Sequence, residues 1–432
     1  MARKMKDSSI EWIGEIPIDF TLYKLKYLLS SPLCYGANES GTLYSDILPR
    51  YIRITDISPN GTLKNSGMLS LDESSAQNYM LHEGDILFAR SGATVGKSFI
   101  YHNYYGRAAY AGYLIKASFN RLVLPEFVYY YTCSSAYEIW KNSIFIQSTI
   151  QNIGADRYSN LPISVPNSID KQLRIVHYLN DFCSKFDAII YNLQTSIEEY
   201  KKLKQAVITQ AVTKGVCGKR EMKDSGVEWI GEIPKHWSVI PSKFLFANCD
   251  ERRREGDVQL TASQKYGMIS QEEYMRRENA RIVLADKGLE NWKHVEPFDF
   301  VISLRSFQGG LEMSEVTGCA TWHYIILRAR QRIHPYYYKW LFKSSMYITT
   351  LQRTCNYIRD GQDLRYSNFV KVPLCIPTLY EQQKIADFLD RKCAKIDHLI
   401  TLKQSKIEKL EQYKRSLIYE YVTGKREVSC DE

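Results

Sequence analysis

The sequence lacks the clustered cysteines and histidines that mark metal sites and disulfide frameworks. Its 432 residues include ten cysteines and eight histidines, but no CxxC pair and no nearby CxxH or HxxxH spacing occurs. Scattered thiols of this kind are typical of reduced proteins. We therefore expect no disulfide, no bound metal and no cofactor.

Long apolar stretches are also missing. No run of 18 apolar residues is present, and the first residues, Met1-Ala2-Arg3-Lys4-Met5, lead into no apolar signal-peptide core. This pattern argues against a membrane protein, and we expect a protein of the cytoplasm.

Motifs for catalysis are absent or defective. The segment GATVGKS at residues 92–98 has three residues between its glycines where a Walker loop requires four, so its backbone N–H groups would miss a phosphate. We find no Asn-Pro-Pro-Tyr-like or Pro-Cys methyltransferase motif, no glycine-rich S-adenosylmethionine loop, no HExxH and no clear nuclease pairing of carboxylates with lysine. The sequence predicts a non-catalytic chain, although nuclease residues that only the fold would bring together remain an alternative.

What is present is a modest excess of positive charge on an ordinary globular composition. Lys and Arg total 57 against 48 Asp and Glu, which gives a net charge of +9, and 44% of the residues are hydrophobic. A basic balance favours a polyanion such as DNA through counterion release, but alone it is a weak indicator. The length exceeds what one hydrophobic core usually serves, so we expect two or more domains.

The chain carries the same frame twice. Residues 5–17 read MKDSSIEWIGEIP and residues 222–234 read MKDSGVEWIGEIP, identical at eleven of thirteen positions. Residues 157–166, RYSNLPISVP, have a counterpart in RYSNF at 365–369 and VPLCIP at 372–377. Such internal repeats indicate a duplicated architecture.

A long amphipathic helix is predicted after each copy. Apolar residues recur in steps of three and four, and a shift of 210 residues superposes the two stripes, with Lys392 and Lys403 as exceptions. Each helix would run about 40 residues, or roughly 60 Å. Because so narrow a stripe needs a partner helix, we predict that the two helices pack through Ile175, Leu179, Phe186, Leu193, Ile385, Leu389, Ile396, Leu399 and Ile407.

The spacing of the stripe is close to that of a coiled coil, with Glu and Lys residues beside it. Two stutters are predicted, at Ile189-Leu193-Ile197 and at Leu399-Lys403-Ile407. Glycines in the segments 213–215 and 423–425 mark the helix ends. The expected fold is therefore mixed α+β, with two globular domains alternating with two long helices that pack as an antiparallel coiled coil in a pseudo-twofold internal repeat.

Between these shared elements the two halves diverge. Residues 18–156 and 235–364 have little in common, although both mix short β-branched and aromatic runs with turn residues. Each segment has a common domain size of about 130 to 150 residues. A shared frame that carries two different globules suggests two different readings of similar ligands.

This order of variable domain, long helix, variable domain and long helix resembles the specificity subunit of type I restriction-modification enzymes over essentially the whole chain. The resemblance rests on the doubled opening motif EWIGEIP, on GDILFARSG at residues 84–92, on DFVISLRSFQGG at 299–310, and on the Glu381-Gln382 pair after a proline-bounded strand. In the first half Lys171 replaces this glutamate, and one residue is inserted.

The resemblance implies target-recognition domains at residues 1–166 and 216–377, and spacer helices at 167–215 and 378–426. It also implies double-stranded DNA, two modification (methyltransferase) subunits and restriction (translocase/endonuclease) subunits as partners. The DNA target would be bipartite and asymmetric, one half-site for each variable domain, and the partners would carry out methylation and cleavage.

Candidate DNA-reading residues are polar, basic or aromatic and follow predicted strands in the variable domains, because guanidinium forks read guanine and amides read adenine. We place Arg90, Ser91, Thr94 and Lys97 in the first domain and Arg305, Ser306, Phe307 and Gln308 in the second, each in a loop. Phosphate contacts are assigned to Arg157, Arg252, Arg253, Arg254 and Arg365. The competing interpretation for each arginine is an ion pair with a nearby carboxylate.

The sequence favours a non-catalytic DNA-recognition subunit. A fused restriction or modification enzyme is the alternative, and the purified chain alone would then cut or methylate DNA. A scaffold that grips proteins is a third hypothesis, and DNA of random sequence would then not compete for binding.

Overall fold

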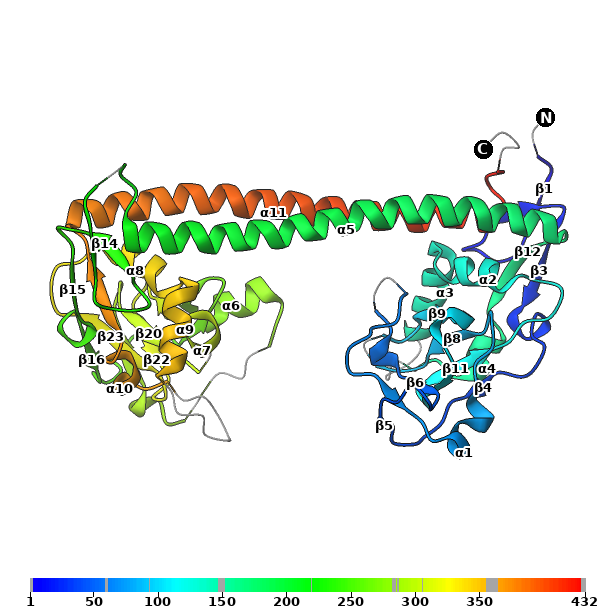
Figure 1. Ribbon diagram of the computed structural model, residues 1–432, viewed down its shortest axis with the longest axis horizontal. Coiled ribbons are helices and arrows are strands. Elements are labelled where there is room, and N and C mark those ends of the chain that lie inside the picture. Colours follow the sequence, from blue (N-terminus) through cyan, green and yellow to red (C-terminus); the bar gives the residue numbers. More distant parts are fainter. Residues whose placement is uncertain are drawn as a thin grey trace. The chain divides into compact units, whose positions relative to one another are not determined.

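The computed structural model describes residues 3–58, 61–92, 94–146, 152–218, 220–281, 285, 287–304, 306–354 and 364–428. The chain divides into two compact units, Met1–Gln194 with Gln404–Glu432, and Thr195–Lys403. Each unit holds one globule and a segment of each long helix, α5 (Ile169–Lys214) and α11 (Leu379–Val422), as Figure 1 shows. The predicted fold class is confirmed.

In the first unit, the opening motif forms a small hairpin, and the globule is built on two sheets. The hairpin pairs β1 (Met5–Asp7) with β2 (Glu15–Pro17). One sheet has the antiparallel order β4 (Cys34–Tyr35), β11 (Leu114–Ala117), β8 (Ile86–Ala89), β9 (Ser98–Ile100). The other has the order β10 (Ala108–Tyr110), β6 (Arg50–Ile52), β7 (Leu69–Ser70), β5 (Thr42–Leu43). Its helices are α1 (Glu73–Ala76), α2 (Pro125–Thr132), α3 (Ser135–Ile146) and α4 (Ala155–Ser159).

The second unit repeats the frame with a different globule. Its hairpin pairs β13 (Met222–Asp224) with β14 (Glu232–Pro234). The main sheet has the order β16 (Phe246–Cys249), β23 (Ile325–Ala329), β20 (Phe300–Ile302), β21 (Glu312–Met313). Two further pairs are β17 (Leu260–Ser263) with β18 (Gly267–Ser270), and β19 (Lys293–Val295) with β22 (Gly318–Ala320). Its helices are α6 (Gln271–Glu278), α7 (Ser306–Gly309), α8 (Pro335–Phe342), α9 (Ser345–Arg353) and α10 (Tyr366–Phe369).

Each globule begins and ends on one antiparallel strand pair. In the first unit β3 (Phe20–Lys24) pairs with β12 (Pro162–Pro166), which leads into α5. In the second, β15 (Ser238–Pro241) pairs with β24 (Pro373–Ile376), which leads into α11. The strands that carry the chain into and out of each globule are therefore hydrogen-bonded neighbours.

The start of each long helix is anchored by a buried glutamine. Gln172 donates from Nε2 to the carbonyl oxygens of Leu122 and Pro166 and accepts the backbone N–H of Leu124. Gln382, 210 residues later, donates to Pro377 O and accepts the N–H of His334. The glutamine of the repeated motif thus ties each helix to its own globule.

The two helices pack antiparallel within each unit. In the first unit, the Tyr178 and Tyr421 ring centroids lie 4.5 Å apart, and Asp187 contacts Lys414. As the residue number rises along α5 it falls along α11, which defines the antiparallel direction. The core of the first unit takes Ile175 and Leu179 from α5 and residues 417–422 from α11, whereas the core of the second takes residues 208–212 of α5 and Ile385 and Leu389 of α11.

The line of apolar contacts between α5 and α11, here called the seam, departs from the prediction in two places. At each place the more buried residue is the one after the predicted residue. Ile190 is buried whereas Ile189 is 43% exposed, and Leu399 is 39% exposed whereas its neighbour Ile400 is half-buried. The buried and half-buried positions therefore step 186, 190, 193 and 197, which removes the stutter predicted there, and Leu399 is more exposed than Ile400. Of the other predicted positions, Ile175, Leu179, Ile385, Leu389, Ile396 and Ile407 are buried, and Phe186 and Leu193 are half-buried.

Two lysine–aspartate pairs flank the seam at equivalent places. Lys204 Nζ lies 2.7 Å from both carboxylate oxygens of Asp397 in the second unit. In the first unit Lys414 Nζ lies 2.6 and 2.8 Å from those of Asp187. Both residues of one pair are 210 positions from those of the other, so the repeat extends to the polar contacts of the coiled coil.

The residue that departs from the repeated motif also has a structural consequence. Lys171 Nζ lies 2.6 Å from Asp19 Oδ2 at the start of α5. The equivalent Glu381 accepts hydrogen bonds from Arg220 Nη1 at 2.7 Å and Trp237 Nε1 at 3.1 Å, and lies 3.0 Å from His236 Nε2. The two junctions therefore use ion pairs of opposite polarity.

A glycine follows the end of each long helix. The helices α5 and α11 end at Lys214 and Val422, and Gly215 and Gly424 just beyond them both adopt a φ of +74°, as expected of glycine helix stops.

In the described part of the chain, no helix combines the length and the apolar character that a membrane-spanning helix needs.

We expect Ile407→Asp to lower the free energy of unfolding by about 3 kcal/mol, because it places a charge in the buried seam. The control is Leu399→Asp, because Leu399 is 39% exposed on the same helix whereas Ile407 is buried. Urea unfolding followed by circular dichroism measures both. Equal destabilisation by the two substitutions would contradict the observed register.

The environment of Glu381 leads us to expect that the free energy of unfolding depends on pH. Burial raises the pKa of Glu381, but hydrogen bonds from His236, Thr378 and Arg220 outweigh burial and lower the pKa from 4.5 to about 2. A carboxylate with a lowered pKa stabilises the fold above its unfolded pKa, and this stabilisation is lost as the pH falls from about 4.5 towards 2. Thermal melts across this range should show a weaker pH dependence for Glu381→Gln than for the wild type, and identical slopes would refute the prediction.

Candidate nucleic-acid interface

The end of β8 presents the first group of predicted DNA-reading residues. The backbone N–H of Arg90 donates to Tyr113 O at 3.1 Å, and the carbonyl oxygen of Arg90 accepts the N–H of Ile153 at 2.8 Å. Ser91, the next residue, forms an isolated β-bridge with Asn152. The backbone is thus held from both sides where the strand leaves the sheet.

The guanidinium group of Arg90 lies over two tyrosine rings. Its guanidinium carbon is 5.0 Å from the ring centroid of Tyr35 and 5.9 Å from that of Tyr113. Both rings are exposed, Tyr35 by 43% and Tyr113 by 62%, and the Tyr35 hydroxyl accepts the N–H of Ala155 at 3.0 Å. Cation–π contacts of this kind fix the orientation of a guanidinium group. We call Arg90, Tyr35 and Tyr113 the arginine clamp.

Two glycines make the clamp possible. A Cβ atom at Gly36 would collide with the carbonyl oxygens of Tyr110 and Ala111, and one at Gly112 would collide with the side chain of Asn38. Because both positions lack a side chain, the two backbones approach closely, and the Gly112 N–H donates to Ala37 O at 2.7 Å. Tyr35 and Tyr113, each next to one of these glycines, are thereby brought to the same arginine.

The other predicted residues of the first globule lie close by in the chain. Between β8 and β9, the described residues 91, 92 and 94–97 are held by hydrogen bonds from Gly96 N to Ala89 O and from Lys97 N to Thr94 O. Lys97 is exposed and Thr94 is half-buried. Arg157 is exposed on α4, and the next residue, Tyr158, donates its hydroxyl proton to Ala89 O at 3.1 Å. Arg90, Ser91 and Arg157 thus come from segments that are hydrogen-bonded to one another.

The predicted reading residues of the second globule are placed differently. Arg305 lies outside the described residues. Ser306, Phe307 and Gln308 lie in the short helix α7 rather than in a loop. Ser306 is buried, and its Oγ accepts the N–H of Ser303 at 2.9 Å, so its side chain cannot reach DNA in this conformation. Phe307 is half-buried and Gln308 is exposed.

The three consecutive arginines of the second globule differ in their contacts. Arg254 contacts Glu251 and Glu296, the latter at 3.2 Å, and Arg252 donates to Asn291 O at 2.9 Å. Within the described part of the chain, the exposed side chain of Arg253 has no hydrogen-bond or ion-pair partner. Arg365 is exposed and directly precedes α10. Of the three, Arg253 is therefore the side chain that would have no described intramolecular hydrogen bond or ion pair to give up on binding a phosphate.

Sequence reasoning missed Tyr35, Tyr113 and the exposed pair Trp322 and His323. Trp322 is 55% exposed and stacks on His323 with ring centroids 3.4 Å apart. A signal existed for the two tyrosines, since each adjoins a glycine, but their approach to Arg90 depends on residues far apart in the sequence.

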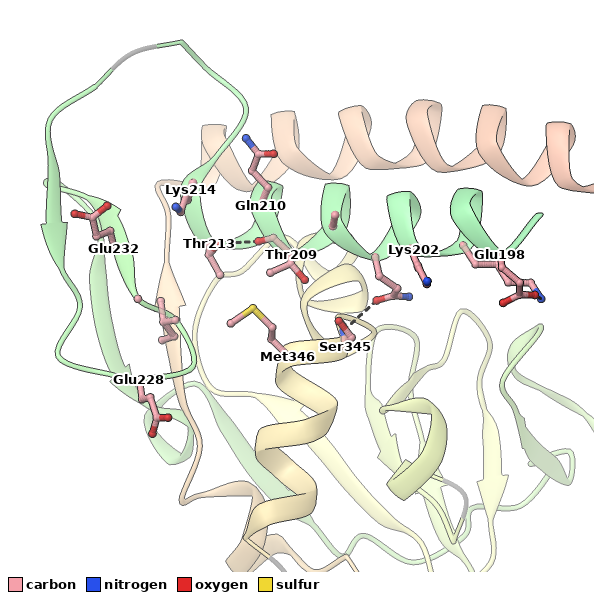
Figure 2. Close-up of a pocket in the computed structure, with 15 residues that line it drawn as sticks. Glu198, Lys202, Thr209, Gln210, Thr213, Lys214, Glu228, Glu232, Ser345 and Met346 are labelled. Atoms are coloured by element: carbon pink, nitrogen blue, oxygen red, sulfur yellow. Dashed lines mark hydrogen bonds and ion pairs between the residues drawn. The ribbon is translucent and has the colours of Figure 1, made fainter. Parts of the chain in front are cut away.

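A groove lies beside α5 in the second unit. It has a volume of about 890 Å³, and Figure 2 shows Thr209 and Thr213 of α5 facing Ser345 and Met346 of α9 across it. Charged residues at its rim include Glu198, Lys202, Lys214, Glu228 and Glu232. Met346 is 38% exposed there.

The equivalent place in the first unit is filled from within. Tyr419, 210 residues after Thr209, donates from its hydroxyl to Ile13 O at 3.0 Å and packs against the core that contains Ile13 and Ala136. Ile230 and Met346 are the counterparts of Ile13 and Ala136 at the groove. The groove thus exists where threonine stands in place of tyrosine.

The doubled frame carries two unlike globules, one in each compact unit. Residues 44–199 match the family model described as the type I restriction modification DNA specificity domain. The chain is 23% identical over 438 residues to a putative type I restriction enzyme MjaX specificity subunit of Methanocaldococcus jannaschii, covering 96% of this chain and 95% of the relative. A type I restriction enzyme MjaVIII specificity subunit of the same organism is 24% identical over 164 residues, 38% of this chain and 36% of that one.

A solved chain from work on complex assembly and conformational transition of the type I R-M system has the same fold. Its TM-score is 0.67 at 13% identity, and the superposition covers 95% of this chain and 99% of that one. The resemblance predicted from the repeated motifs is confirmed: residues 44–199 match a type I restriction modification DNA specificity domain, and nearly the whole chain is similar to a type I restriction enzyme specificity subunit.

We expect Thr209→Tyr to raise the free energy of unfolding by about 1 kcal/mol, because the ring would fill the groove as Tyr419 does in the first unit. Thr209→Phe is the matched variant without the hydroxyl that would donate to Ile230 O, and it should stabilise less. The backbone acceptor at position 209, which bonds Thr213 Oγ1, is kept in both. Thermal melts measure the effect, and destabilisation by both rings would contradict the equivalence of the two places.

Proposed function

We propose that the chain binds double-stranded DNA at a bipartite, asymmetric target, with one half-site read by each globule. The observation that carries this proposal is that one repeated frame, down to its lysine–aspartate pairs, carries two globules whose main sheets share one strand arrangement but whose residues differ. A frame conserved within the chain points to a common geometry of binding, and surfaces that differ point to different sequences.

The target-recognition domains of the proposal are residues 1–166 and 216–377, and the spacer helices are residues 167–215 and 378–426. The DNA-facing groups are the predicted residues that lie at the surface: Arg90, Ser91, Thr94, Lys97, Arg157, Arg252, Arg253, Arg254, Phe307, Gln308 and Arg365. Arg305 stays in the proposed set on its sequence position alone.

The chain is proposed to be non-catalytic and to act in the cytoplasm on the DNA found there. Two modification subunits would carry out the methyl transfer and the restriction subunits the translocation and cleavage, as the family resemblance implies. This division of labour is supported by the absence of methyltransferase and nuclease motifs from the sequence.

The experiment is a map of methylated motifs in cells that express the modification subunit with and without this chain. We expect adenine methylation at one bipartite motif when both are present and none with either alone; the adenine follows from the family resemblance. Methyl transfer or cleavage by the purified chain alone would instead establish the fused-enzyme alternative.

Arg253 and Arg254 provide a test of the phosphate contacts. Arg253→Ala should weaken binding to all DNA sequences and reduce the slope of log K against log salt by about 0.9, because one phosphate contact is lost. Arg254→Ala should change the slope less, because Glu251 and Glu296 already pair with that side chain. Filter binding at several salt concentrations measures both slopes, and a larger effect of Arg254→Ala would reverse the assignment.

A further inference from the structure

We propose that the arginine clamp reads a guanine in the half-site of the first globule, with Arg90 as the base-contacting residue and Tyr35 and Tyr113 as positioning residues. This inference rests on the proposed function and adds to it a base and the side chain that reads that base.

Arg90 is free of the internal ion pair that occupies other arginines of the chain. Arg254 pairs with Glu251, Arg53 lies 2.8 Å from Asp56, and Arg328 lies 2.7 Å from Asp299. Within the described part of the chain, no carboxylate lies within ion-pair distance of Arg90. Its positive charge is therefore compensated by two ring faces and not by an anion.

The clamp leaves one edge of the guanidinium group for a ligand. Arg90 Nε is buried and has no hydrogen-bond partner among the described residues, whereas the side chain as a whole is half-exposed. The terminal Nη groups are the remaining donors. Two parallel N–H donors at the end of an arginine match a ligand with two acceptors side by side.

Guanine presents such a pair of acceptors in the major groove. Its O6 and N7 atoms accept a bidentate pair of hydrogen bonds from arginine, and no other base offers two acceptors in that arrangement. Because the backbone of Arg90 is hydrogen-bonded on both sides and its side chain is held by two rings, little conformational entropy is lost on binding. A rigid fork of this kind discriminates between bases.

The second globule supplies the comparison that separates a base contact from a phosphate contact. Strands β8 and β20 occupy the same place in sheets of the same order, with Ile86 opposite Ala117 and Phe300 opposite Leu327. Buried Asp85 and Asp299 directly precede the two strands, so Arg90 corresponds to Leu304.

Leu304 is 68% exposed and uncharged. A contact that only positions the backbone of DNA would serve both half-sites equally, because every sequence has phosphates. A residue that differs in chemistry at the same exposed place is what two different half-sites require. The difference between Arg90 and Leu304 favours a reading role for position 90.

The test uses the complex of the chain with its modification subunit and DNA duplexes that carry the wild-type motif or single-base changes in it. Arg90→Ala and Arg90→Lys should each lower affinity for the wild-type motif about 10- to 100-fold and remove discrimination at one guanine of one half-site. Lysine keeps the charge but not the fork, so it should not restore discrimination. The matched control is Arg107→Ala, which removes an arginine of the same globule that pairs with Glu73 and should leave the motif unchanged.

Tyr113 tests the positioning role. Tyr113→Ala should weaken discrimination at the same guanine, and Tyr113→Phe, which keeps the ring, should retain it. Thermal melts of the variants within about 2 °C of the wild type would show that the globule is folded. If Tyr113→Phe and Tyr113→Ala lost discrimination equally, the ring would not position Arg90 and the clamp would be refuted.

The possible results distinguish failure of the guanine assignment from failure of the proposed function. A uniform loss of affinity over all sequences in Arg90→Ala would mean a phosphate contact and overturn this inference, while the unaltered second half-site would leave the proposed function standing. The inference is equally overturned if the half-site of the first globule contains no guanine. Absence of any bipartite motif in the wild-type complex would refute the proposed function itself.

Discussion

Burial of one apolar stripe per helix is the constraint on which the structure depends. A helix of 46 residues with a narrow stripe cannot bury that stripe against its own globule alone, so each helix needs a second one along its length. The solution is reciprocal: each core is closed by the beginning of one helix and the end of the other. Neither half of the sequence therefore contains all the residues of the core that its globule rests on.

This reciprocity explains why particular positions of the helices repeat while the globules differ. Stripe positions, the lysine–aspartate pairs and the buried glutamines recur at an interval of 210 because they must fit both cores. The junctions tolerate a change as long as the partner changes too, as Lys171 with Asp19 and Glu381 with His236 show. Surfaces away from the helices carry no such requirement, and there the two globules differ.

The sequence was sufficient for the architecture because its signals are local and doubled. Repeated motifs and stripe periodicity predicted the helices, their ends and their direction. The register failed at Ile189-Ile190 and Leu399-Ile400, where two adjacent residues are both apolar and a step of three or four is equally consistent with the stripe. The facing helix decides between them, and periodicity contains no information about that neighbour.

The site was less predictable, because it depends on contacts between distant segments. Arg90 could be singled out from the residues that follow its strand, but the clamp joins residues 35, 90 and 113 through two close backbone approaches. The prediction that Ser306 lies in a loop was wrong, because a helix of four residues has too little periodicity to be detected in the sequence. The Ser306 hydroxyl oxygen instead accepts a hydrogen bond from the backbone N–H of Ser303. Short-range patterns locate candidates, whereas long-range packing decides which of them face solvent.

The pairing of β3 with β12, and of β15 with β24, has a consequence for how such a chain can change over generations. Each variable segment leaves the frame on one strand and returns to it on the neighbouring, hydrogen-bonded strand. Its two ends therefore lie side by side whatever structure forms between them. A recombination event at those two points exchanges a whole globule while the helices, the junctions and their ion pairs stay intact. If the globules bind DNA as proposed, such an event would bring a new specificity in one genetic step, without the gradual loss of stability that accumulating point substitutions would bring.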